Sequence, residues 1–129
     1  MNGIYNWFVL NNIFGDNFSL NGSQVCNMKS TALDGRLSVD FVTVQKVINP
    51  SPRWKEWNEI YIKLDFFGVN EVHTKITDEN FVITDFSIKI DSGRYILNIR
   101  SEKGSFIKAE FSTGGLVQNV KPIPMDSDF

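Results

Sequence analysis

The chain has 129 residues and a formal net charge of −2, which is the size of one domain without the basic excess of a nucleic-acid binder. Hydrophobic residues make up 42% and charged residues 22% of the chain, values that argue against disorder. Eleven Phe, three Trp and three Tyr favour strands over helices. The composition therefore predicts a single β-rich domain over residues 1–129 that binds no nucleic acid.

The N-terminal residues and the cysteine content predict the compartment. Residues 1–10 have no positively charged start, and Asn11-Asn12 ends their apolar run early, so we expect no signal peptide. No stretch approaches the ~20 apolar residues needed to span a membrane. Cys26 is the only cysteine, so no intrachain disulfide can form. We therefore predict a cytoplasmic protein that does not enter a membrane.

The first third of the chain predicts one helix and one hairpin. Residues 4–14 are the best helix candidate, and Gly15 can end the helix. The spacing would place four side chains on one helical face: Ile4, Trp7, Phe8 and Asn11. Residues 25–33 and 36–41 predict a β-hairpin, because Asp34-Gly35 between them suits a tight turn.

Residues 44–58 interrupt the strand rhythm and predict a long loop. The sequence Asn49-Pro50-Ser51-Pro52 cannot donate ladder hydrogen bonds at its two prolines. Trp54 and Trp57 follow, and they have two interpretations. They can cap the core at one end of the sheet, or they can form an exposed aromatic platform for a partner, since Trp anchors protein interfaces well.

Beyond residue 58, the alternation of apolar and polar residues predicts an antiparallel meander. Short alternating segments lie at 60–66, 72–76, 86–90, 95–99, 107–111 and 116–120. Polar or glycine-containing turns separate them at 68, 77–80, 91–93, 102–104 and 114–115. The pattern predicts a mainly β fold, an antiparallel meander of about seven to eight strands in a sandwich or partly closed barrel, with a short N-terminal helix. We expect residues 121–129 to form an extended tail.

The residues that carry common chemistry form no recognisable catalytic or metal-binding pattern. With one His and one Cys, His73 and Cys26, a zinc site has too few ligands, and no serine elbow or phosphate-binding loop occurs. Cys26 and His73 could act as nucleophile and base, but both fit ordinary strand positions better. Five carboxylates could pair as in a glycosidase or lie on solvated faces: Asp78, Glu79, Asp85, Glu102 and Glu110. We therefore expect no enzyme activity, no metal and no cofactor.

The order of segments resembles a known family. In chain order, the segments that carry the resemblance are Phe14-Gly15-Asp16, the tryptophan loop at 50–57, the segment 58–69, the strand 81–88 and Tyr95-Ile96-Leu97. The most specific part is Leu64-Asp65-Phe66-Phe67-Gly68-Val69. From about Trp7 to Val120, this order resembles the Immunity protein 50 family. The resemblance implies a small bacterial protein of a polymorphic toxin system that protects a cell by binding a cognate toxin, and it carries no catalytic motif.

The first functional hypothesis is therefore an immunity protein that occludes a toxin through steric and electrostatic contact. The candidate partner contacts are Trp54 and Trp57 as aromatic anchors, with Asp78, Glu79 and Asp85 as acidic contacts. Three alternatives stay open. Trp54, Trp57 and Tyr61 could stack on a sugar in a small-ligand or carbohydrate-binding β-module, a carboxylate pair could form an enzyme site, or an exposed edge strand could mediate self-association.

Overall fold

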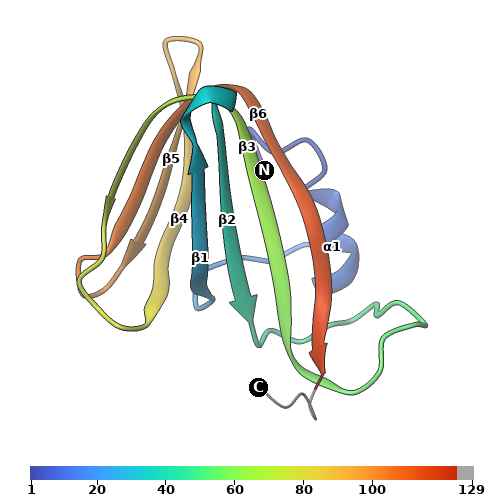
Figure 1. Ribbon diagram of the computed structural model, residues 1–129. Helices are drawn as coiled ribbons and strands as arrows, with labels where there is room; N and C mark the ends of the chain where they lie inside the picture. Colours follow the sequence, from blue (N-terminus) through green and yellow to red (C-terminus); the bar gives the residue numbers. More distant parts are fainter. Residues whose placement is uncertain (125–129) are drawn as a thin grey trace.

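The structure, a computed structural model, describes residues 1–124 of the chain. Six antiparallel strands form one sheet in the order β1-β2-β3-β6-β5-β4, which closes into a barrel (Figure 1). The elements are α1 (Phe8–Phe14), β1 (Gln24–Thr31), a 3-10 turn (Ala32–Asp34), β2 (Arg36–Thr43), β3 (Trp57–Lys75), β4 (Phe81–Asp91), β5 (Arg94–Ser101) and β6 (Phe106–Pro124). The prediction of a mainly β, antiparallel fold with a short N-terminal helix is confirmed.

The two longest strands, β3 and β6, pair along their length and bend together halfway (Figure 1). The register shifts between Phe67 and Val69, where Gly68 has a φ of 73°, and Gly114 on the facing strand has a φ of 147°. Glycine adopts such angles at little cost. A bulge of this kind bends the strand that carries it, so the two halves of β3 and of β6 belong to different parts of the sheet.

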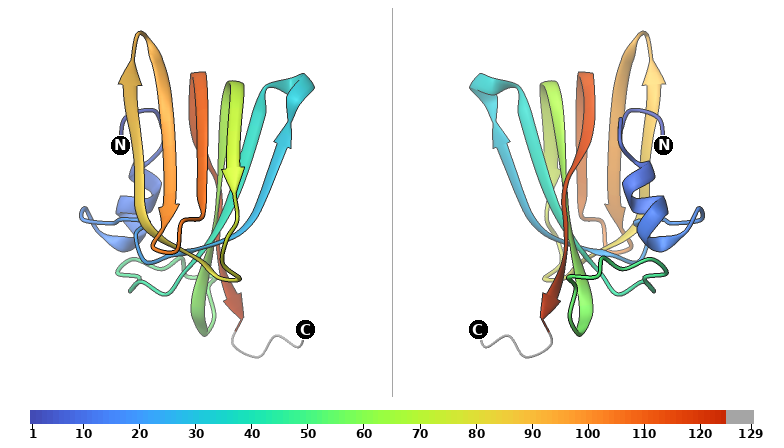
Figure 2. Two further views of the ribbon diagram at one scale, coloured as in Figure 1. Left: turned by 90° about the vertical axis from the view of Figure 1, so that its left-hand side faces the viewer. Right: turned by 90° about the vertical axis from the view of Figure 1, so that its right-hand side faces the viewer.

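The bend divides the sheet into two arms that enclose the core. The first arm contains β1, β2, residues 57–67 of β3 and residues 114–124 of β6. The second arm contains β4, β5, residues 69–75 of β3 and residues 106–111 of β6. In Figure 2 the β1–β2 and β4–β5 hairpins splay apart toward one end of the molecule. At the other end, β1 pairs with β4 through the first residues of each strand, which closes the barrel.

Alternation along the strands explains which side chains form the core, because successive residues point to opposite faces of a sheet. The first arm buries Leu37, Val39, Phe41, Ile60, Ile62, Leu64 and Phe66. The second arm buries Phe81, Ile83, Leu97, Ile99, Ile107, Ala109 and Phe111. Next to the bend, the ring centroids of Phe66 and Phe111 lie 5.1 Å apart, so the two arms share one continuous core.

The N-terminal segment seals the flank of the barrel between β6 and β4. The Asn6 side chain exchanges two hydrogen bonds, of 2.7 and 3.0 Å, with the backbone of Val117 in β6. The Asn21 side chain accepts a hydrogen bond of 3.1 Å from the Phe86 N–H in β4. Between these attachments, α1 and its flanks bury Trp7, Leu10, Phe14, Phe18 and Leu20 in the core. This flank of the barrel is therefore closed by the chain itself.

The helix is shorter than the sequence predicts, and the predicted buried face is confirmed at Ile4 and Trp7 but wrong at Phe8. It begins at Phe8 rather than at residue 4, because the Tyr5 N–H bonds the Gly115 carbonyl at 3.0 Å and ties the preceding residues to β6. Leu10 is fully buried, whereas Phe8, expected on the buried face, is 61% exposed. Neither helical segment of residues 1–124 has the length and apolar character to cross a bilayer.

The strand count is six rather than seven or eight, because Gly68 and Gly114 bend long strands instead of ending them. The hairpins predicted around Asp34-Gly35, 91–93 and 102–104 are confirmed. The first connection is a 3-10 turn over Ala32–Asp34 followed by Gly35 rather than a tight turn, so β1 ends at Thr31 instead of residue 33. The predicted loop ends earlier than expected, since Trp57 is already part of β3. Residues 121–124 of the predicted tail extend β6, and the remaining residues of that tail lie outside the described residues.

Replacement of Gly68 by Ala should destabilise the protein by about 2–3 kcal/mol, because it strains the bend in two ways. Ala is strained at a φ of 73°, and its Cβ would lie 2.9 Å from the backbone nitrogen of Thr113. Gly93→Ala is the matched control, since Gly93 has a φ of 78° but no atom within 4 Å of an added Cβ. Urea unfolding followed by circular dichroism should show the larger loss for Gly68→Ala. Equal losses would show that the close approach of the two strands has no energetic effect.

Candidate functional site

A groove lies between β1 and the second half of β3, on a flank that the N-terminal segment does not cover; we call it the β1–β3 groove. Near the bend it is lined by Ser30, Thr31, Gly35 and Arg36 together with residues 69–72 of β3. Near the start of β4 it is lined by residues 25–28 of β1 together with Thr74, Ile76, Asp78, Glu79, Phe81 and Ile107. The two parts follow one another along the same pair of strands.

Both strands that border the groove have one edge without a strand partner among residues 1–124. The pairing of β2 with β3 ends at Phe67, so residues 69–75 of β3 pair only with β6. The pairing of β1 with β4 ends at Val25, so residues 26–31 of β1 pair only with β2. Strand edges of this kind present unpaired backbone N–H and C=O groups. The groove is therefore bordered by backbone that can accept a further strand.

The β1–β3 groove has an apolar floor and an acidic rim. The floor consists of half-buried side chains that pack against the core: Val25, Met28, Val69 and Val72. On the rim, the Asp78 carboxylate accepts hydrogen bonds from the hydroxyls of Ser101 and Ser105, which hold the turn between β3 and β4. Glu71 and Glu79 are exposed. The groove thus combines apolar burial with negative charge.

The remaining charged residue that lines the groove, Arg36, forms an ion pair with a buried carboxylate. Its Nη2 lies 2.5 Å from Oδ2 of Asp65, a carboxylate with 0% exposure. The Ser38 hydroxyl donates to Oδ1 of Asp65 at 2.5 Å, and the Arg36 guanidinium lies 5.5 Å from the ring centroid of Phe67. These residues join β2 to β3 directly before the bend at Gly68. The segment 64–69, which carries the most specific part of the resemblance, therefore has a structural role.

Asp40 lies on the outer face of the first arm and perturbs two neighbouring groups. Partial burial, followed by the hydrogen bond and the charge of Asp40, raises the pKa of the Tyr61 hydroxyl to about 12. Partial burial and the same carboxylate raise the pKa of the Cys26 thiol. Although Cys26 is exposed, a raised pKa keeps it protonated at neutral pH, and a protonated thiol is a poor nucleophile. Cys26 therefore lacks the activation that a catalytic cysteine needs.

The perturbation of Tyr61 can be measured directly. In the folded protein Tyr61 should ionise near pH 12, well above the ordinary value of about 10. Because the folded state holds this proton more tightly than the unfolded chain, the stabilising effect is present below pH ~10 and is lost as the pH rises through the folded pKa. Asp40→Asn should lower the pKa of Tyr61 in a phenolate absorbance titration, with Tyr61→Phe identifying the signal. An unchanged titration in Asp40→Asn would contradict the role of that carboxylate.

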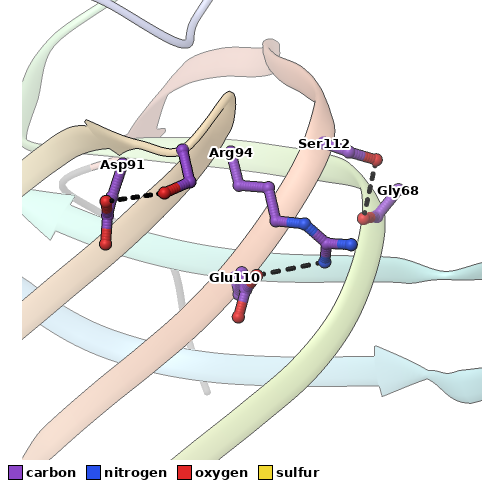
Figure 3. A network of polar contacts seen from close by, with 6 residues as sticks. Gly68, Asp91, Arg94, Glu110 and Ser112 are labelled. Carbon is purple, nitrogen blue, oxygen red and sulfur yellow. Dashed lines mark hydrogen bonds and ion pairs between the residues drawn. The ribbon is translucent and has the colours of Figure 1, made fainter.

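The outer face of the second arm carries a polar network (Figure 3). Arg94 reaches from the β4–β5 hairpin to Glu110 of β6, with Nη1 3.0 Å from Oε1. The Ser112 hydroxyl donates to the Gly68 carbonyl at the bend, at 3.3 Å. Exposed ion pairs of this type contribute at most about 1 kcal/mol. The network is that of a solvated strand face.

Of the two catalytic pairings considered from the sequence, the Cys26–His73 pair is joined by no hydrogen bond in the described part of the chain. His73 Nε2 lies 2.6 Å from Oε1 of Glu71 on the outer face of β3. Among the candidate carboxylates, Asp78 lines one pocket together with Glu79 and another together with Glu102. Asp85 faces Arg100 at 3.6 Å and Glu110 faces Arg94. Residues 1–124 also contain no group of three or more His, Cys, Asp or Glu that could hold a metal ion.

Trp54 and Trp57 lie at the start of β3 and are half-buried against the core. Their ring centroids are 5.5 Å apart with an interplanar angle of 83°, which is a favourable edge-to-face arrangement. A hydrogen bond of 3.0 Å from the Trp54 N–H to the Ser51 carbonyl shapes the preceding turn. Both rings thus occupy the position that the capping interpretation gives them.

The five residues predicted as partner contacts lie in three separate places. Asp78 and Glu79 share the rim of the β1–β3 groove. Trp54 and Trp57 form the aromatic pair at the start of β3, and Asp85 pairs with Arg100 of the neighbouring strand β5. The edge residues that border the groove were not predicted from the sequence. No local signal marks them, because whether a strand edge is free depends on which distant segment pairs with it.

Fold and groove together define a class: a small antiparallel barrel that presents an open, acidic strand edge and whose core is sealed elsewhere by its own N-terminal segment. Residues 6–122 match the family model described as Immunity protein 50, and the chain belongs to this family. The resemblance inferred from the sequence is thereby confirmed over almost the same range. No curated protein and no solved structure matches the chain. The name of the family suggests an immunity protein.

Proposed function

We propose that this protein neutralises a cognate bacterial toxin by binding it and occluding its active site. The observation that carries the proposal is membership of the Immunity protein 50 family over residues 6–122. A protein with this task needs a rigid scaffold and a specific surface, and it needs no reactive group of its own. The shared core of the two arms supports rigidity, and the β1–β3 groove offers a surface.

The charges around the groove favour a basic region of the toxin. Of the charged lining residues, Glu71 pairs with His73 and the single lining arginine, Arg36, pairs with Asp65, which leaves Asp78 and Glu79 as the acidic groups of the groove. An acidic surface attracts a basic one, accelerates the encounter and rejects partners of like charge. Occlusion of a basic active-site cleft is therefore the mode of inhibition that fits these residues best.

The alternative of a small-ligand or carbohydrate-binding module receives less support from the geometry. Stacking on a sugar uses flat, accessible ring faces, but the Trp54 and Trp57 rings are half-buried and lie at 83° to each other. We therefore favour toxin binding over sugar binding. The proposed role involves no catalysis, cofactor or metal and is exercised in the cytoplasm. Trp54, Trp57 and Asp85 stay predicted contacts, whereas Asp78 and Glu79 are favoured because they share the groove.

The test of this proposal is co-expression, in a bacterial host, with the product of the gene immediately upstream of its own. We expect the product alone to stop growth, and we expect co-expression of this protein to restore growth and to yield a complex on size-exclusion chromatography. An unrelated immunity protein serves as the control for specificity. Growth arrest that persists although the protein is expressed and folded would refute the proposal.

A further inference from the structure

The two flanks of the barrel differ in what covers them. Residues 1–23 bind to β6 and β4 on one flank through Asn6 and Asn21. Within residues 1–124, no segment pairs with the facing edges 26–31 and 69–75 on the other. Isolated edges are sites at which another chain can add a strand. The asymmetry raises the question of which chain pairs there.

We propose that an extended segment of the cognate toxin, with basic side chains beside apolar ones, pairs as an added strand in the β1–β3 groove. This inference rests on the function proposed above and specifies its binding face and its mode of recognition. Main-chain hydrogen bonds to the open edges supply affinity, and the side chains that line the groove supply specificity.

The ends of the groove define the length of the added strand. At the bend, the Val69 N–H donates to the Gly35 carbonyl at 2.8 Å and joins the two borders. At the opposite end, Val25 pairs with Phe81 of β4. Between these points β1 offers residues 26–31, enough for a strand about 20 Å long at roughly 3.3 Å per residue.

The lining determines the side chains that such a strand should carry. Successive residues of a strand point to opposite faces, so alternate positions would face the apolar floor formed by Val25, Met28, Val69 and Val72. The intervening positions would face the rim, where Asp78 and Glu79 favour Lys or Arg. Lys29 and Lys75 lie on the two open edges, where lysines discourage unspecific strand pairing.

Charge also favours a toxin segment over a second copy of this protein. If two copies paired through the same groove, their rims would bring Asp78 and Glu79 of each copy together. Like charges placed face to face at an interface are unfavourable. A basic segment meets no such repulsion.

Hydrogen exchange of the co-purified complex tests the proposal directly. In the free protein, the amides at 26–31 and 70–75 that point away from the paired neighbouring strand should exchange faster than those of strand β5, which is paired on both sides. Binding should slow the edge amides by at least about tenfold, because they acquire main-chain partners. Slower exchange of the amides around Trp54 and Trp57 would instead indicate that the toxin binds at the aromatic pair.

A charge reversal on the rim provides the second measurement. Glu79→Lys should weaken binding of the same toxin about tenfold at low salt, through slower association. Asp16→Lys is the matched control, since Asp16 is an equally exposed turn residue of the N-terminal segment, and its affinity should stay within about twofold of wild type. Circular dichroism verifies that both variants fold.

The outcomes separate this inference from the proposed function. If binding protected the amides around Trp54 and Trp57 from exchange but left exchange at both edges unchanged, the groove would not be the binding face. The proposed function would still hold. Equal affinities for Glu79→Lys and Asp16→Lys would overturn the charge argument. Self-association through protected edges in the absence of toxin would identify a second copy as the occupant. If no complex forms with the adjacent product, the proposed function fails and the groove inference fails with it.

Discussion

Arg36→Ala should lower the free energy of unfolding by about 3–5 kcal/mol, because it leaves a buried carboxylate without its counter-ion. Asp65 has 0% exposure, and the Arg36 guanidinium lies 2.5 Å from its Oδ2. The Ser38 hydroxyl satisfies the other oxygen, but a neutral donor does not balance the charge. The substitution therefore leaves the Asp65 carboxylate as an unpaired charge in the interior. An unpaired buried charge is one of the few causes of so large a loss of stability.

The reverse substitution is the informative control for this pair. Asp65→Ala leaves Arg36, whose side chain is 40% exposed, so water can solvate the remaining charge and the loss should be smaller. The double variant Arg36→Ala, Asp65→Ala should be more stable than Arg36→Ala alone. Urea unfolding of the three variants measures the coupling. A loss below about 1 kcal/mol for Arg36→Ala would place the pair among ordinary surface ion pairs.

Trp7→Ala should cost about 3–5 kcal/mol, because it removes the largest side chain that the N-terminal segment places in the core. Trp7 is 7% exposed, and its ring stacks on Phe86 of β4 with centroids 6.3 Å apart and an interplanar angle of 22°. It also contacts Phe18, at 5.8 Å between centroids. The substitution would leave a cavity where the segment closes the barrel.

Phe8→Ala is the matched control for Trp7→Ala, since Phe8 is the adjacent aromatic residue but is 61% exposed. Its replacement should change stability by less than about 0.5 kcal/mol. Circular dichroism is the appropriate probe of unfolding, because Trp7 contributes to the tryptophan fluorescence. Similar losses for both variants would mean that the N-terminal segment does not seal the flank as described.

Local pattern was sufficient to predict much of this fold. The period of two placed Leu37, Val39 and Phe41 on one face and predicted the strands around them, because side-chain direction along a strand depends only on position in the sequence. Turn residues located the hairpins for the same local reason. The glycines at 68 and 114 were harder to interpret, since a glycine permits either a turn or a bulge, and the choice depends on the facing strand.

The sequence offers Asp78 and Glu79 as candidate contacts, but it does not predict the groove that they line. Asp78 and Glu79 could be named as contacts because a polar turn was expected at 77–80. Their position beside the open edges of β1 and β3 depends on pairings between segments far apart in the chain. The sequence marks Trp54 and Trp57 as unusual, but it does not show that both rings pack, half-buried, against the core.

The sequence by itself thus determined the β class, the strand faces, most turns and the family, all of which follow from residue order and from a period of two. The tertiary structure decided which strand edges are satisfied and which are open. It also decided that Asp65, an outward-facing strand residue, is buried beneath Arg36. The physical reason is that backbone hydrogen bonding between strands is non-local. Periodicity specifies the direction of a side chain, but only the pairing of distant segments specifies what lies beside a strand.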